Sequence, residues 1–253
     1  MNNPKNVSIV VPVFNEQDSI IALINEISIK LEENNIKEVI FVNDGSNDLT
    51  KQKILEAKIK NDFVKIIDFK LNTGKSAALS KGFAHASGDY IITMDGDLQD
   101  DPSEINKFIN KLNEGWDLVC GWKKTRKDPI SKRFPSKIYN FFVRIVTGIK
   151  LNDFNCGFKG YRASIAKSIF LYGGLHRFIP AILGNRGCSI CEVEVNHRAR
   201  KHGVSKYGFS RFFHGFFDFI TILFLNKFTK RPMHFFGGIG SVFFLIGVGI
   251  SIY

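Results

Sequence analysis

This sequence has few cysteines, shows no pattern of an N-terminal leader, and carries few acidic side chains in two long stretches. Four cysteines in 253 residues are too few for a disulfide-stabilised scaffold. The first residues, MNNPKNVSIVVP, show no basic region followed by a small-residue cleavage site, so we expect no signal peptide. With 44% hydrophobic and 23% charged residues, the composition excludes a disordered chain, a collagen-like repeat and a polytopic membrane protein. We expect a sizeable globular body that stays in the cytoplasm.

The chain has a net charge of +11, and the scarcity of acids makes these two stretches strongly basic. Residues 122–150 contain nine Lys or Arg and one acid, and residues 198–231 contain eight and one. Such patches indicate anionic partners: nucleic acid, phosphorylated small molecules or anionic lipid. A merely solvated charged face would usually carry interspersed acids, so we favour a role that faces phosphate.

Apolar runs alternate with helical patterns over the first 120 residues. The expected strands are Val7–Phe14, Val39–Val42, Val64–Phe69, Asp89–Met94 and Asp117–Gly121, and the helices between them include 17–34, 74–86 and one beginning near Asp101. This alternation predicts an α/β fold with a parallel sheet covered on both faces. Ligands of such sheets bind beyond the carboxyl ends of the strands. Polar clusters fall at those ends: Asn15-Glu16, Asp44-Gly45-Ser46 and Asp95-Gly96-Asp97.

The Asp95-Gly96-Asp97 sequence, followed by Gln99, predicts a divalent cation site. Carboxylate and amide oxygens suit Mg²⁺ or Mn²⁺, which commonly bridge to substrate phosphates. Gly96 would leave room for a ligand to approach the backbone. A capped turn is the alternative for an isolated D-x-D, but its place after an apolar strand, near the acidic strand ends Glu16 and Asp44, favours the site.

The C-terminal part differs from the rest in composition. Residues 209–228 are rich in Phe, Ile and Leu but contain charges, which predicts a buried helix or one in a membrane interface. Phe235–Tyr253 follows without a charge and is long enough to span a bilayer, although a core helix is the alternative. Lys227, Lys230 and Arg231 stand before it, which predicts that this side faces the cytoplasm. Its glycines favour close helix packing, so self-association is left open.

An ordered series of motifs over nearly the whole chain resembles family 2 glycosyltransferases. Within that family it is most similar to the branch of dolichol-phosphate mannose synthase and bacterial polyprenyl-phosphate glycosyltransferases. The motifs are Pro12-Val13-Phe14-Asn15-Glu16, Val42-Asn43-Asp44-Gly45-Ser46, Asn72-Thr73-Gly74-Lys75, Met94-Asp95-Gly96-Asp97-Leu98-Gln99-Asp100, Asp153–Lys159, His176-Arg177-Phe178 and His197–Tyr207. Each motif alone is modest, whereas the ordered series is specific.

The resemblance implies a GT-A-type nucleotide-sugar-binding domain with a mostly parallel central sheet, followed by C-terminal interfacial helices and a transmembrane segment. The implied bounds are 1–207 for the catalytic domain, 208–232 for juxtamembrane helices and 233–253 for a membrane helix. That helix is either the span of a naturally short form or the first of several. The implied donor site consists of Pro12, Phe14 and Glu16 at the nucleoside, Asp44 at the base, Lys75, Gly96, Asp95 and Asp97 toward the diphosphate, Asp97 and Gln99 on the metal, and Arg200 and Lys206 closing on the phosphates. Asp95, Asp97, Arg200 and Lys206 are the implied catalytic residues.

The acceptor that fits the charge pattern is a phosphate monoester. Its second pKa is about 6, so it is largely dianionic at neutral pH and attacks without a general base. Candidate cations for it are Arg126, Arg133, Lys137 and Arg177. The predicted reaction is metal-dependent, inverting transfer of a hexose from a UDP- or GDP-sugar to undecaprenyl or dolichyl phosphate, at the cytoplasmic face of the inner membrane.

Two alternatives stay open at this point. One is a family 2 glycosyltransferase with a non-lipid glycan acceptor, for which the acid-poor stretch 122–150 offers few general bases. The other is a non-catalytic basic module that binds membrane surfaces or nucleic acid. We expect no nucleic-acid partner, because the acids at the strand ends would repel a bare polyanion.

Overall fold

A computed structural model describes residues 5–124, 140, 143–145, 147–199, 221, 224 and 232–252. The chain divides into two compact units, Met1–Lys206 and Tyr207–Tyr253, and each is described by itself. The expected domain bounds at 207 and 232 stay a prediction.

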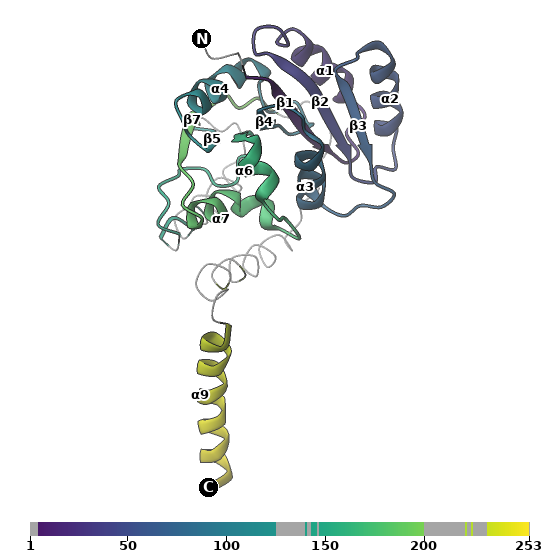
Figure 1. The fold of residues 1–253 in the computed structure, drawn as a ribbon. Coiled ribbons are helices and arrows are strands. Elements are labelled where there is room, and N and C mark those ends of the chain that lie inside the picture. The colour runs from purple at the N-terminus through teal and green to yellow at the C-terminus, as the bar shows by residue number, and fades with distance from the viewer. Residues whose placement is uncertain are drawn as a thin grey trace. The chain divides into compact units, whose positions relative to one another are not determined.

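The first unit is built on one seven-stranded sheet with the order β3-β2-β1-β4-β6-β5-β7 (Figure 1). Its strands are β1 (Val7–Val13), β2 (Ile36–Asn43), β3 (Val64–Asp68), β4 (Tyr90–Thr93), β5 (Leu118–Trp122), β6 (Lys159–Arg162) and β7 (Ile190–Glu194). Every pairing is parallel except those of β6, which runs antiparallel to β4 and β5. The expectation of a mostly parallel sheet is confirmed.

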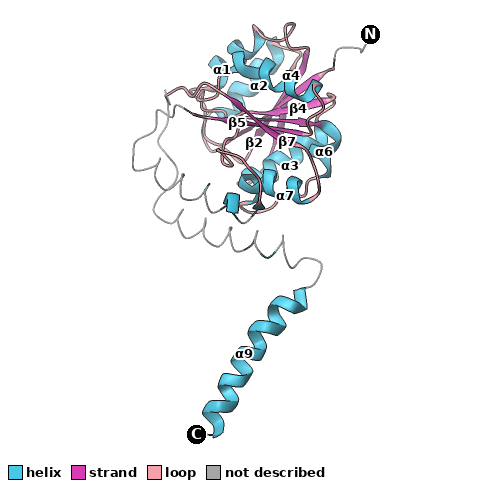
Figure 2. Ribbon diagram, turned by 90° about the vertical axis from the view of Figure 1, so that its left-hand side faces the viewer, coloured by secondary structure: helices cyan, strands magenta, loops and turns pink. Residues whose placement is uncertain are grey.

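Helices cover both faces of this sheet. They are α1 (Ile20–Ser28), α2 (Thr50–Lys60), α3 (Lys75–His85), α4 (Ile105–Asn113), α6 (Ala163–Ser168) and α7 (Ile179–Asn185), with 3₁₀ turns η1 (Pro102–Glu104) and η2 (Leu175–Phe178). Figure 2 shows α1, α2 and α4 on one side of the strands and α3, α6 and α7 on the other. Side chains alternate along β1 accordingly: Ile9 and Val11 belong to the core with α1, whereas Val10 lies against Gly82 of α3.

The carboxyl ends of β1, β2 and β4 meet at one edge, as expected. Val13 pairs with Asn43, so β1 and β2 end at the same level. Beyond them the backbone N–H of Asn15 donates to Ser46 Oγ at 2.9 Å, and that of Glu16 donates to Thr50 Oγ1 at 2.8 Å. The two loops are therefore held side by side. Asn15, with φ 52°, ends the extended run, and α1 begins only at Ile20, later than the helix expected from residue 17.

The second unit contains α9 (Pro232–Ile252). Its residues Met233–Ile252 are long and apolar enough to cross a membrane, with a mean hydropathy of 2.1, and none of that window is buried inside the protein. The uncharged segment expected to span therefore forms one helix. The expected interfacial segment 209–228 lies outside the described residues, apart from Thr221 and Phe224.

Candidate active site

Three carboxylates gather in the loop that follows β4. The loop turns back on itself: the N–H of Asp95 donates to Asp100 Oδ2 at 3.0 Å, and the N–H of Gln99 donates to Asp97 Oδ1 at 3.2 Å. Leu98 adopts φ 63° in this turn. Asp97 and Asp100 are almost fully buried, and Asp95 is partly exposed. The loop therefore concentrates negative charge at the carboxyl end of β4.

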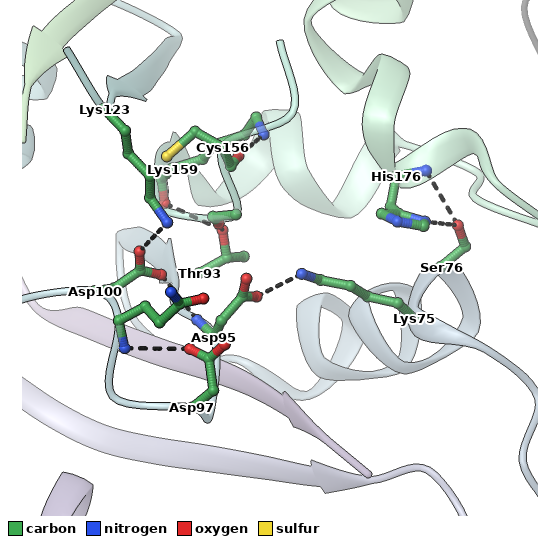
Figure 3. A network of polar contacts seen from close by, with 12 residues as sticks. Lys75, Ser76, Thr93, Asp95, Asp97, Asp100, Lys123, Cys156, Lys159 and His176 are labelled. Atoms are coloured by element: carbon green, nitrogen blue, oxygen red, sulfur yellow. Dashed lines mark hydrogen bonds and ion pairs between the residues drawn. The ribbon is translucent and has the colours of Figure 1, made fainter. Parts of the chain in front are cut away.

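Three lysines from distant parts of the chain surround these carboxylates (Figure 3). Lys75, the first residue of α3, forms an ion pair with Asp95. Lys123 follows β5 and lies 2.8 Å from Asp100 Oδ1; the Asp100 side chain is fully buried and that of Lys123 is 11% exposed. Lys159 of β6 is also buried and donates to the carbonyl of Cys156. The site is thus a cluster of alternating charges, which we call the Asp95 cluster: Lys75, Asp95, Asp97, Asp100, Lys123 and Lys159.

The charges of the cluster stabilise one another. Burial alone would raise the pKa of Asp95, but the ammonium groups of Lys75 and Lys123 hold that pKa far below its ordinary value. Burial alone would likewise lower the pKa of Lys123, and the neighbouring Asp100 raises it well above the usual range. Asp95 and Lys123 are therefore both charged at neutral pH.

A histidine and a serine extend the site beside Lys75. Ser76 Oγ lies 3.0 Å from His176 Nδ1 and also accepts the backbone N–H of His176 at 3.1 Å. Burial, together with the positive charges of Lys75 and Arg177, lowers the pKa of His176 to about 3. The imidazole is therefore neutral at physiological pH, and it ties η2 to the first turn of α3.

Two glycines set how closely the loops pack around Asp95. A Cβ on Gly157 would lie 2.7 Å from both Asp95 carboxylate oxygens, so the backbone of 156–158 runs directly against the carboxylate. A Cβ on Gly96 would lie 2.7 Å from Val13 Cγ1. Close packing against Val13 is therefore one reason for a glycine at position 96, and the expected approach of a ligand there stays a prediction.

Asp44 is bonded to the turn that begins α3. Its Oδ1 accepts from the N–H and the Oγ1 of Thr73 at 2.8 and 3.0 Å, and its Oδ2 accepts from the N–H of Gly74 at 2.9 Å. The sequence predicted that Asp44 reaches a base, whereas here both oxygens hold the residues that precede Lys75. Through these bonds Asp44 fixes the turn from which Lys75 extends.

The other predicted site residues are placed as follows. Pro12, Phe14 and Glu16 lie half-buried at the end of β1, next to the loop after β2. Arg177 is half-buried in η2, adjacent to His176. Arg126, Arg133, Lys137, Arg200 and Lys206 lie outside the described residues, and their roles stay predictions.

Sequence reasoning missed the roles of six residues in this arrangement: Ser76, Asp100, Lys123, Gly157, Lys159 and His176. Five of them stand inside or beside the motifs quoted above, but motif membership does not reveal which side chain pairs with which. Lys123 was counted only as part of a basic stretch. Its place directly after an apolar strand was the signal that could have singled it out.

The oxygen donors fit a divalent cation that shares its ligands with a substrate. Among the described residues, no group of three or more His, Cys, Asp or Glu side chains is close enough to hold a metal alone. Asp97 is 7% exposed, and the Gln99 amide donates to the carbonyl of Arg198 at 3.5 Å, which leaves its carbonyl oxygen to act as a ligand. Mg²⁺ usually binds one or two protein carboxylates and takes its other ligands from water and phosphate, and this site can supply that number.

Similar proteins place the chain in a family. The model of Glycosyl transferase family 2 matches residues 8–170. Dodecaprenyl-phosphate galacturonate synthase of Rhizobium johnstonii is 39% identical over 239 residues, which are 92% of this chain and 71% of that protein. Undecaprenyl-phosphate 4-deoxy-4-formamido-L-arabinose transferase of Salmonella choleraesuis is 34% identical over 251 residues, 98% of this chain and 75% of that protein.

Solved structures agree on the fold. Glucosyl-3-phosphoglycerate synthase from Mycobacterium tuberculosis, in complex with Mn²⁺ and UDP-glucose, superposes with a TM-score of 0.69 at 19% identity, covering 88% of this chain and 79% of that one. The expected GT-A-like class is therefore confirmed. So are the resemblance and the expectation of an enzyme, against a non-catalytic module. This chain belongs to glycosyl transferase family 2 and is a glycosyltransferase.

Proposed function

We propose that this glycosyltransferase moves a sugar from a nucleotide-sugar donor to a polyprenyl phosphate at a membrane surface. Both curated relatives are named for a polyprenyl-phosphate product or acceptor, and each is more than 30% identical over nearly the whole chain. Their names give galacturonate and a formamido-arabinose, so the proposed donor sugars extend beyond the hexose expected from the motifs.

The Asp95 cluster is the observation that carries the proposal. A nucleotide sugar brings a diphosphate, whose negative charge grows as the bond to the sugar breaks. The Lys75 side chain is partly exposed, so its ammonium can turn from Asp95 toward such a phosphate. Asp97 and Gln99 would hold Mg²⁺ or Mn²⁺, and the cation would neutralise the departing diphosphate. Arg200 and Lys206 are proposed to add charge from the C-terminal motif.

The cluster also fits an acceptor that needs no base. Asp95, with its lowered pKa, is a weak base, and so is His176, whose pKa is about 3. A phosphate monoester dianion is itself the nucleophile: one of its oxygens bonds to C1 of the sugar while the bond from C1 to the diphosphate breaks. Attack from the opposite face inverts C1. Arg126, Arg133, Lys137 and Arg177 are proposed to bind the acceptor phosphate.

A membrane location follows from the same acceptor. A polyprenyl chain is confined to the bilayer, and α9 is long and apolar enough to span it. Three basic residues, Lys227, Lys230 and Arg231, precede α9 in the sequence. By the positive-inside rule we place that side, and the catalytic unit with it, in the cytoplasm at the inner membrane.

The test is transfer of label from a panel of UDP- and GDP-sugars to undecaprenyl or dolichyl phosphate. We expect radioactivity in the lipid phase that requires Mg²⁺ or Mn²⁺ and is abolished by EDTA. Donor hydrolysis without lipid label would overturn the polyprenyl acceptor and point to a glycan acceptor. Lipid label that persists in EDTA would overturn the metal.

The metal ligands are tested by Asp97→Asn. We expect at least a 100-fold loss of turnover, because one charged ligand is lost where the diphosphate charge develops. Asp89→Asn is the matched control, since Asp89 lies before β4 at the opposite end of the same strand and should leave turnover unchanged. Near-normal turnover of Asp97→Asn, with the thermal unfolding midpoint preserved in both variants, would remove Asp97 from the metal site.

A further inference from the structure

A second feature of the catalytic unit lies outside the Asp95 cluster, on the outer face of α3. An open groove runs between the loop after β3, this helix and the segment after α6, and we call it the Phe170 groove. Its apolar and basic lining includes Lys70, Leu71, Ala77, Lys81, Phe170 and Leu171. Leu71 and Phe170 are each 76% exposed, and the ring of Tyr172, 48% exposed, lies 5.8 Å from that of Phe170. Three large apolar side chains therefore meet water in one place.

The charge around the groove is positive. Lys70 and Lys81 line it and are exposed. Two further cations are exposed near this segment of the chain: Lys167 stands three residues before Phe170, and the Arg186 guanidinium donates to the carbonyl of Ser168 at 3.0 Å. The acid that lines it, Asp68, is already paired with Lys51 at 2.7 Å.

We propose that the Phe170 groove rests on the surface of an anionic phospholipid bilayer. Exposed aromatic and leucine side chains flanked by lysines are the combination that binds the headgroup region, with the apolar groups inserted and the cations at the phosphates. The inference rests on the proposed function in one respect, that α9 anchors the chain in such a bilayer.

The groove and the active site share α3. Ser76, which bonds to His176, is buried on the inner face of this helix, whereas Ala77 and Lys81 line the groove on its outer face. Contact of the groove with lipid would therefore hold Lys75, at the beginning of the helix, at a fixed height above the headgroups. A polyprenyl phosphate presents its phosphate in the headgroup region, so the same contact would limit the distance between Lys75 and the acceptor.

The test places a fluorescent reporter in the groove of the full chain. Phe170→Trp is reconstituted in vesicles of phosphatidylcholine and phosphatidylglycerol with brominated acyl chains, which quench tryptophan at short range. Ile59→Trp is the matched control, because Ile59 is 84% exposed on α2, across the sheet from α3. Wild-type chain corrects for Trp116 and Trp122.

We expect the fluorescence added by Phe170→Trp to be quenched at least twofold more than that added by the control substitution. We also expect the excess to fall when Lys70 and Lys81 are both changed to Glu. Equal quenching of the two reporters would overturn the proposal. So would quenching that needs added undecaprenyl phosphate, which would assign the groove to the acceptor chain instead.

Transfer activity measured on the same vesicles separates the two proposals. Activity without excess quenching would overturn the groove contact alone. Excess quenching without transfer to any polyprenyl phosphate would support the groove contact and overturn the proposed reaction.

Discussion

At the scale of single residues, Asp44 lies outside the Asp95 cluster but positions one of its members, Lys75. Its carboxylate accepts three bonds from Thr73 and Gly74, so it determines where α3 begins and where Lys75 stands. Asp44→Asn replaces one acceptor oxygen by a donor facing N–H groups. A lost bond to a charged group costs about 1.5–3 kcal/mol. Because a displaced Lys75 would bind the donor diphosphate less well, we expect the donor to lose binding energy of this size. The KM for the nucleotide sugar should then rise roughly tenfold or more.

Steady-state kinetics with varied donor checks this expectation. Asp62→Asn, an exposed change between α2 and β3, is the control and should leave both constants unaltered. If Asp44→Asn lowered kcat and left the donor KM alone, Asp44 would not act through binding of the donor.

His176 determines how stability depends on mild acid. Its pKa is about 3 in the folded protein against an ordinary 6.5. Between these two pH values the unfolded chain therefore binds a proton at His176 and the folded protein does not. The contribution of His176 to the free energy of unfolding is therefore largest above pH 6.5 and falls as the pH drops below that value. Between pH 7.5 and pH 5 the loss is about 2 kcal/mol. The thermal unfolding midpoint in detergent should fall over this range, and His176→Asn should flatten the decline.

Glu38 also makes stability depend on pH, but in a more acidic range than His176. Burial would raise its pKa, but bonds from Lys65, Ser8 and Ser87 lower it to about 2 from an ordinary 4.5. Its share of stability is therefore lost mainly below pH 4.5, so the range from pH 7.5 to 5 separates the contribution of His176 from that of Glu38. An unchanged slope in His176→Asn would contradict a buried neutral imidazole.

Among the elements, α3 connects the core to the active site. A Cβ on Gly82 would lie 2.3 Å from Val10 Cγ1 and 3.3 Å from Val42 Cγ2, so the helix sits directly on β1 and β2. Gly82→Ala should push α3 away from the sheet and destabilise the fold by about 1–3 kcal/mol, the usual range for overpacking. Lys81→Ala, one residue away on the exposed face, should change stability by no more than about 0.5 kcal/mol.

Calorimetry of both variants checks the effect on stability, and donor KM checks its consequence for Lys75. A Gly82→Ala protein as stable as the parent would mean that α3 does not pack on Val10 as closely as the structure shows.

The elements also show how far sequence reasoning reaches. The strands over residues 7–122 could be predicted, because each is an apolar run bounded by polar turns. The acids at their ends could be predicted to meet, because parallel strands share an edge. β6 could not be foreseen, since Lys159–Arg162 is short, half polar and becomes a strand only by pairing between β4 and β5.

The contacts inside the site were beyond the sequence for a related reason. Lys75, Lys123 and Lys159 meet around Asp95 only once three separate elements have packed, and nothing in their spacing reports that. Asp44 shows the opposite case: its place at the strand end was predicted, but its bonds to the 73–74 turn depend on a loop 29 residues further along the chain.

At the scale of the whole molecule, the charged catalytic unit contrasts with an α9 that carries none of Asp, Glu, Lys or Arg. A lysine at the centre of a membrane helix disfavours insertion by about 2.5–3.5 kcal/mol, whereas valine favours it slightly. Val242→Lys lies at the middle of α9 and should shift most of the chain into the supernatant on alkaline carbonate extraction.

Ile252→Lys is the matched control, because Ile252 is equally apolar but lies in the last turn of α9, where a lysine can extend its ammonium to the interface. This variant should stay in the membrane pellet like the parent chain. If Val242→Lys also stayed in the pellet, α9 would not be the anchor, and the retention would have to come from residues before it. The comparison thus decides whether α9 is what keeps the enzyme in the bilayer to which the polyprenyl acceptor is confined.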